Sequence, residues 1–103
     1  MASSKEYLDY IMDQISHAED VSYRPMMGEF IIYCTGKVVG GVYDDRFLVK
    51  PTASAKRAMP DGRYEKPYDG AKDMLLVENL DNKEFLKTLL ERIAEDLPDK
   101  MKK

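Results

Sequence analysis

The fold of this chain is decided by residues 29–50, which read EFIIYCTGKVVGGVYDDRFLVK. This segment contains three runs rich in β-branched and aromatic residues: 30–34, 38–43 and 47–49. Residues 35–36 (Thr-Gly) separate the first two runs, and residues 44–46 (Asp-Asp-Arg) separate the last two. Apolar runs that alternate with such turn-forming residues are typical of neighbouring antiparallel strands. We therefore predict a three-stranded antiparallel meander.

Two consecutive glycines, Gly40 and Gly41, lie inside the middle run. Glycine weakens a strand because it is flexible and has no side chain to pack, so its presence requires a reason. A β-bulge is one reason, and the close approach of another element to the backbone is a second. We expect a helix to pack against these glycines.

Helical patterns flank the meander on both sides. Upstream, a capping-box pattern begins at Ser3, and apolar residues at helical spacing predict a helix of about four turns that ends near His17. Downstream, Asp81 caps a helix that begins at Asn82 and is stopped by Pro98. The residues expected to face the core are Leu8, Ile11, Ile15, Phe85, Leu89 and Ile93.

Between the meander and the last helix, residues 53–59 predict a short helix, 63–73 an edge strand and loop, and 74–77 a buried strand. The element order is then α-β-β-β-α-β-β-α. Only the first and last helices are long and apolar enough to cover a sheet. We therefore predict a two-layer α+β fold: a mainly antiparallel five-stranded sheet with helices packed on one face.

The composition predicts one globular domain that covers residues 1–103, because 44% hydrophobic and 34% charged residues are ordinary globular usage. No apolar stretch approaches the roughly 20 residues that a membrane helix needs. The single cysteine, Cys34, cannot form an intramolecular disulfide, and with the single His17 it cannot build a Cys/His zinc site. We expect a cytoplasmic protein without metal or other cofactor, with Cys34 as a buried apolar side chain and His17 partly exposed.

The formal net charge is −3, whereas a domain that binds phosphate backbones needs a concentrated basic surface. Lysines at 100, 102 and 103 are interpreted as a solvated tail. Tyr64 and Tyr68 lie among basic residues, as in single-strand binders, but Glu65 and Asp69 interrupt the positive potential. We interpret that segment as a solvated edge strand, and we expect no autonomous nucleic-acid binding.

Three candidate features each have two interpretations. Arg24 and Lys50 could hold an anion beside the Gly28 amide, or Arg24 could bond within its own domain while Gly28 permits a tight turn. Met26 and Met27 could form an adaptable contact surface, or one could lie in the core while the other covers a seam. The Asp44-Asp45 pair could serve acid–base or metal chemistry, but adjacent acids between strands favour a turn.

The stretch Arg24-Pro25-Met26-Met27-Gly28 resembles the signature of the TfoX amino-terminal domain family. The same order of features continues through Tyr33, Gly36, the acidic turn and the strand that ends in Lys50, although Met27 stands where the family commonly has Phe. The resemblance implies a two-layer fold similar to that of YjbR-like and secretion-chaperone-like proteins. It also implies a link to TfoX/Sxy regulators of bacterial DNA uptake, which promote transcription together with another activator. We expect no counterpart of their carboxy-terminal domain.

The first functional hypothesis is a non-enzymatic regulatory domain that acts through protein contacts, with a partner such as a transcription activator and as a monomer or weak homodimer. The alternative is a small-molecule or anion-binding protein, which could be an enzyme, with a pocket near Arg24, Tyr33 and Lys50. A deep pocket with convergent polar groups would favour the alternative. The candidate binding residues are Arg24, Met26, Met27, Gly28, Tyr33 and Lys50.

Overall fold

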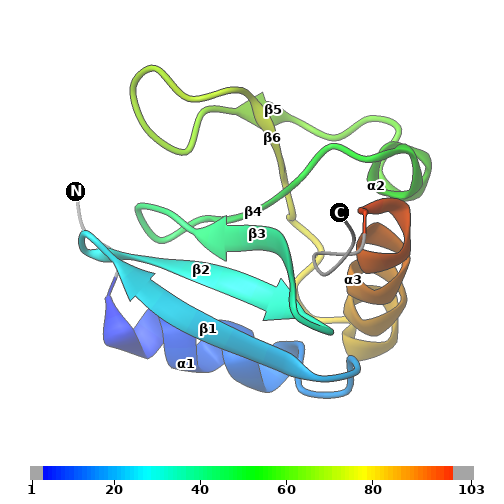
Figure 1. Cartoon of the computed structure of the whole chain (residues 1–103), viewed down its shortest axis with the longest axis horizontal. Helices are drawn as coiled ribbons and strands as arrows, with labels where there is room; N and C mark the ends of the chain where they lie inside the picture. The colour runs from blue at the N-terminus through cyan, green and yellow to red at the C-terminus, as the bar shows by residue number, and fades with distance from the viewer. Residues whose placement is uncertain (1–3, 99–103) are drawn as a thin grey trace.

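A computed structural model describes residues 4–98 of the chain. Within these residues the elements follow one another as α1 (Lys5–Gln14), β1 (Val21–Met26), β2 (Glu29–Cys34), β3 (Lys37–Val42), β4 (Phe47–Val49), α2 (Ala53–Ala58), β5 (Tyr64–Glu65), β6 (Met74–Leu76) and α3 (Lys83–Asp96). The strands form one sheet in the order β1-β2-β3-β4-β6-β5, and every neighbouring pair is antiparallel. The predicted α+β class is confirmed (Figure 1).

The sheet has six strands among the described residues, and the prediction of five missed β1. β1 pairs with β2 alone, and its residues 22–25 are all exposed, so it lacks the alternating apolar pattern by which strands are recognised. Its Pro25 reads as a strand breaker in sequence, but proline is tolerated on an edge strand, where one side of the backbone has no strand to bond. The pairing of β1 with β2 therefore had no recognisable signal in the local sequence pattern.

Tight turns of two residues join the first four strands, which confirms the predicted meander. The flanking pairs are Met26 with Glu29, Cys34 with Lys37, and Tyr43 with Arg46. All six turn residues have positive φ: Met27 (51°), Gly28 (87°), Thr35 (51°), Gly36 (81°), Asp44 (53°) and Asp45 (55°). Positive φ at both central positions is the requirement of type I′ turns, whose twist matches that of paired strands.

The two long helices begin and end at slightly different residues from those predicted. Ser4 caps α1, since its Oγ accepts a hydrogen bond of 3.1 Å from the Tyr7 amide; Ser3 lies outside the described residues. α1 ends at Gln14, and the prediction of an end near His17 was wrong because the backbone already leaves helical geometry at Ile15 (φ −98°, ψ 8°). The cap of α3 is Asn82 and not Asp81. Either residue has a suitable side-chain oxygen, and only backbone geometry selects one.

The core lies between the sheet and the helices α1 and α3, which cover the same face (Figure 1). The helical residues predicted to face the core are fully buried except Phe85, which is half-buried against it. The strands contribute the other side of this layer through Ile32, Cys34, Val39, Val42, Phe47, Val49, Leu75 and Val77. These two helices leave the opposite face of the sheet uncovered, and the β5–β6 loop lies over part of it.

Gly40 and Gly41 lie against strand backbone and a tyrosine ring, so the prediction of a helix there was wrong. A Cβ on Gly40 would collide with the Leu48 carbonyl oxygen of the neighbouring strand. A Cβ on Gly41 would lie 2.6 Å from Cε2 of the Tyr43 ring. The pairing of β2 with β3 shifts register between Ile32 and Tyr33, next to Gly40, and this β-bulge was the other interpretation of the glycines.

Candidate functional site

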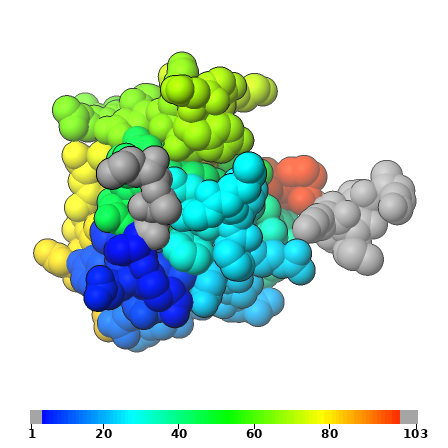
Figure 2. All heavy atoms as spheres, turned by 90° about the vertical axis from the view of Figure 1, so that its left-hand side faces the viewer, coloured from blue at the N-terminus to red at the C-terminus, as the bar shows by residue number. Residues whose placement is uncertain are grey.

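The β1–β2 hairpin carries five of the six candidate residues, all except Lys50. Met27 and Gly28 form its two-residue turn, here called the hairpin tip, and the Met27 side chain is 97% exposed. Met26 precedes the tip and is half-buried. The core interpretation of the methionine pair is wrong for Met27, because a type I′ turn projects this side chain away from the sheet. Figure 2 shows the hairpin, in cyan, on the surface of the molecule.

Arg24 and Tyr33 lie on the sheet face opposite the helices. Arg24 pairs with Ile31, while Tyr33 pairs with Ser22 on one side and Val38 on the other. Paired residues of antiparallel strands share a face, and alternate residues along a strand do as well. Within residues 4–98 the Arg24 side chain makes no hydrogen bond or ion pair, so the prediction of an internal partner for it was wrong there. Gly28 permits the tight turn, as predicted.

Lys50 lies at a different place, beside a groove of about 480 Å³. The groove runs between the open face of the sheet and the loop that joins β5 to β6, and the residues that define it here are Val38, Tyr43, Lys50, Tyr68, Ala71 and Met74. Neither Arg24 nor Tyr33 is among its lining residues. Tyr33 is next to Val38 across the strands, so it adjoins the groove without facing into it.

Tyr43 forms the floor of the groove at the end of β3. Its ring lies over Gly41, which has no side chain to displace it. The Tyr68 ring stands over it with a centroid distance of 6.3 Å and a tilt of 58°. Burial raises the pKa of the Tyr43 phenol, and the neighbouring Tyr68 and Glu29 raise it further, so the hydroxyl stays protonated at neutral pH.

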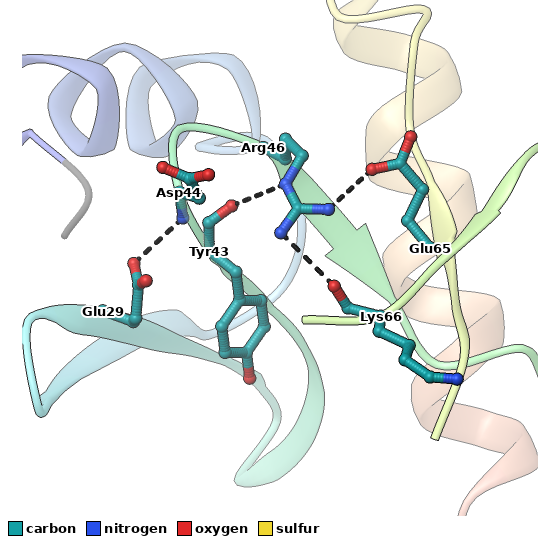
Figure 3. Close-up of polar contacts among 6 residues, drawn as sticks. All are labelled: Glu29, Tyr43, Asp44, Arg46, Glu65 and Lys66. Atoms are coloured by element: carbon teal, nitrogen blue, oxygen red, sulfur yellow. Dashed lines mark hydrogen bonds and ion pairs between the residues drawn. The ribbon is translucent and has the colours of Figure 1, made fainter. Parts of the chain in front are cut away.

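The β5–β6 loop forms the outer wall of the groove, and Arg46 joins the start of this loop to the meander (Figure 3). Its Nη1 donates to Oε1 of Glu65 at 2.6 Å, its Nε to the Tyr43 carbonyl at 3.1 Å, and its Nη2 to the Lys66 carbonyl at 3.3 Å. Glu65 and Lys66 lie where β5 passes into the loop. One planar guanidinium therefore ties the β3–β4 turn to the start of the wall.

The turn itself is held from the other side. The amide of Asp44 donates to Oε1 of Glu29 at 3.0 Å, as Figure 3 also shows. Asp44 and Asp45 are therefore residues of a structured turn, which confirms that interpretation. Among residues 4–98, no group of three or more His, Cys, Asp or Glu side chains could hold a metal ion.

The predicted edge strand is confirmed, because β5 lies at the end of the strand order and Tyr64 and Tyr68 are both exposed. The contribution of the following loop to the groove was not predicted: Pro67 is buried and lines the groove together with Tyr68. The available signal was the adjacent pair Pro67-Tyr68, which places two ring-bearing side chains in an otherwise charged segment. Arg46 was read only as a separator between strands, because its partner Glu65 lies 19 residues further along the chain.

Some of the charged side chains at the groove have an ion-pair partner within the domain, and others do not. The amide of Lys50 donates to the Val39 carbonyl at 2.9 Å, which extends the strand pairing and fixes where the side chain begins. Asp73 lies 3.7 Å from the ammonium of Lys66. The ammonium groups of Lys50 and Lys72 have no hydrogen-bond or ion-pair partner in the part of the chain that the structure describes.

The chain is 32% identical over 80 residues to the uncharacterized 12.7 kDa protein in the trpE 5′ region of Spirochaeta aurantia. The match covers 78% of this chain and 70% of the relative. The chain belongs to the same family as that protein. No family model matches the chain, and no solved structure matches it significantly.

The single cysteine and the single histidine of the chain lie in different surroundings. Cys34 is fully buried, as predicted, and its Sγ donates a hydrogen bond of 3.2 Å to the Glu19 carbonyl oxygen. Burial raises the pKa of the Cys34 thiol to about 11, with the charges of Glu91, Glu19 and Asp20 adding to the effect. His17 is exposed on the turn after α1.

Two further predictions concern membrane-spanning helices and the terminal lysines. No helix within residues 4–98 is long and apolar enough to cross a membrane. The lysines at 100, 102 and 103 lie outside the described residues, so their interpretation as a solvated tail stays a prediction.

Proposed function

We propose that the chain is a non-enzymatic regulatory domain that acts through protein contacts, as its resemblance to TfoX amino-terminal domains implies. The observation that carries the proposal is the state of Met27. It is a large apolar side chain, 97% exposed, in a turn conformation that favours glycine and asparagine.

The backbone conformation of Met27 lowers the free energy of unfolding of the isolated domain. A non-glycine residue with φ near 51° is strained by roughly 1 kcal/mol, and an exposed side chain recovers none of that through packing. A methionine is flexible and polarizable, so it adapts well to a pocket on a partner. The neighbouring Arg24 adds an exposed cation without an internal partner among residues 4–98. The hairpin therefore suits a protein with an apolar pocket beside acidic groups, such as a transcription activator.

The test is the substitution Met27→Asn, which creates the Asn-Gly pair that type I′ turns prefer. It should raise the free energy of unfolding by roughly 0.5–1 kcal/mol while removing the apolar contact. In a bacterium that encodes the protein, the variant should then reproduce the transcript changes and the lowered DNA uptake of a gene deletion. Arg57→Gln, an exposed change on α2, is the matched control and should behave as wild type.

Two results would contradict the proposal at different points. Unchanged competence transcripts in the deletion strain would refute the TfoX-like role. Altered transcripts in the deletion strain together with a fully active Met27→Asn variant would refute the hairpin tip as the contact surface.

The second candidate function is small-molecule or anion binding. The groove beside Lys50 favours it, because its volume lies within the roughly 300–1,000 Å³ of ordinary ligand sites. This groove shares no residue with the hairpin tip, so the two functions can coexist in one domain.

A further inference from the structure

The groove has the walls of a site for an apolar ligand body. Val38 and Met74 contribute aliphatic surface from the sheet, Ala71 contributes it from the loop, and the rings of Tyr43 and Tyr68 line the space between. Its volume of about 480 Å³ lies within the roughly 300–1,000 Å³ of ordinary small-molecule sites. The groove thus fits a small molecule.

The charged side chains that line the groove determine which ligand charge it favours. Its lining includes two lysines, Lys50 and Lys72, and one acid, Asp73, so the lining carries a net charge of 2 − 1 = +1. Asp73 already faces the ammonium of Lys66. The nearby Lys37 is also occupied, since its Nζ donates to the carbonyls of Ala94 and Leu97 at 2.9 and 3.2 Å.

Lys50 is the better placed of the two cations. It follows β4 directly, its amide is bonded to Val39, and its side chain is half-buried against the groove. A partly desolvated ammonium without an internal counter-ion gains from an anionic ligand. A polyanion is disfavoured, because the whole chain carries a net charge of −3.

We infer that the groove binds an amphipathic monocarboxylate, with the apolar body between Tyr43, Tyr68 and Met74 and the carboxylate on the Lys50 ammonium. Lys72 supplies a second cation from the loop. This inference goes beyond the proposed function, because it uses the groove and not the hairpin tip.

The wall of the site is organised before a ligand arrives. The three hydrogen bonds of Arg46 hold the start of the loop against the meander. These bonds fix the point at which the loop leaves the sheet, which reduces the entropy that the loop can lose on binding.

The test uses the full chain labelled with ¹⁵N, titrated with octanoate and followed by amide chemical shifts. Three eight-carbon probes give the chemical comparison: octan-1-ol is neutral, octylammonium is a cation and suberate is a dianion. Octanoate should bind most tightly of the four, with shifts concentrated at Val38, Lys50 and residues 67–74.

Two variants separate the head group from the body. Lys50→Gln should weaken octanoate binding about fivefold to tenfold and abolish the preference for octanoate over octan-1-ol. Ala71→Phe should fill the apolar space and abolish binding of both. Lys56→Gln, an exposed change on α2 outside the groove, is the matched control and should bind octanoate as wild type does.

Equal affinity of wild type and Lys50→Gln for octanoate would overturn the assignment of the carboxylate site. Tighter binding of octylammonium or suberate than of octanoate would overturn the monoanion. If Ala71→Phe does not fold, the inference is tested by Lys50→Gln alone, through its loss of the preference for octanoate over octan-1-ol. A failure of all probes to bind would overturn the inference and leave the Met27 test unaffected, because Met27 is not a groove residue.

Discussion

The substitution Gly41→Ala tests the packing that forms both the sheet and the groove floor. The added Cβ would lie 2.6 Å from Cε2 of the Tyr43 ring and 2.7 Å from the Phe30 carbonyl oxygen. The ring can rotate away, but the carbonyl belongs to β2 and is fixed by pairing of Phe30 with Val42. Overpacking of this kind costs roughly 1–3 kcal/mol, and the backbone contact places this case at about 2–3 kcal/mol.

A loss of about 2 kcal/mol lowers the melting temperature of a domain of this size by about 10 °C, which circular dichroism measures directly. Gly36→Ala is the matched control. Its Cβ would meet nothing within 4 Å, so only the positive φ of 81° is penalised, by about 1 kcal/mol.

The contribution of the ring is isolated by a double-mutant cycle with Tyr43→Ala. Because the aromatic clash disappears in the double variant, the two changes should couple favourably by about 1 kcal/mol, while the clash with the Phe30 carbonyl remains. A Gly41→Ala protein that melts within about 2 °C of wild type would refute the close approach at this glycine.

Two further predictions concern the helix layer and pH. Leu89→Ala should lower the free energy of unfolding by roughly 2–5 kcal/mol, because Leu89 is 2% exposed in the core; Thr88→Ala, on the exposed side of the same helix, should change it by less than about 0.5 kcal/mol. Equal effects of the two changes in urea unfolding would show that α3 presents a different face. Because the pKa of Cys34 is raised to about 11 when folded and is about 8.5 when unfolded, the unfolded state loses its proton first as pH rises. The folded state should therefore lose stability between about pH 9 and 11, and Cys34→Ala should show a smaller loss; identical pH profiles would contradict the burial of this thiol.

The sequence allowed prediction of the elements whose signals are local. The meander was predictable because each strand is apolar and each turn carries residues suited to positive φ or to turns, as at Gly36 and Asp44. The last helix was predictable because its apolar spacing extends over about four turns. Its first residue was wrong by one position, since Asp81 and Asn82 are both good caps.

The candidate site was predictable only in pieces. Lys50 and the hairpin of Met27 were singled out from sequence, and the structure places them on separate features. The groove was not predictable, because its walls come from β3, β6 and the 67–73 loop, which are far apart along the chain. No local pattern encodes that these segments face one another.

By itself, then, the sequence determined the α+β class, the type and order of most elements, and the face by which each of the two long helices packs. These properties follow from turn chemistry and hydrophobic periodicity, which act over a few residues. Tertiary structure alone decided that residues 21–26 join the sheet as an edge, that Arg46 bonds Glu65, and that a groove forms beside Lys50. Each of these depends on segments distant in sequence, whose approach is fixed by the packing of the whole core and not by any one stretch of chain.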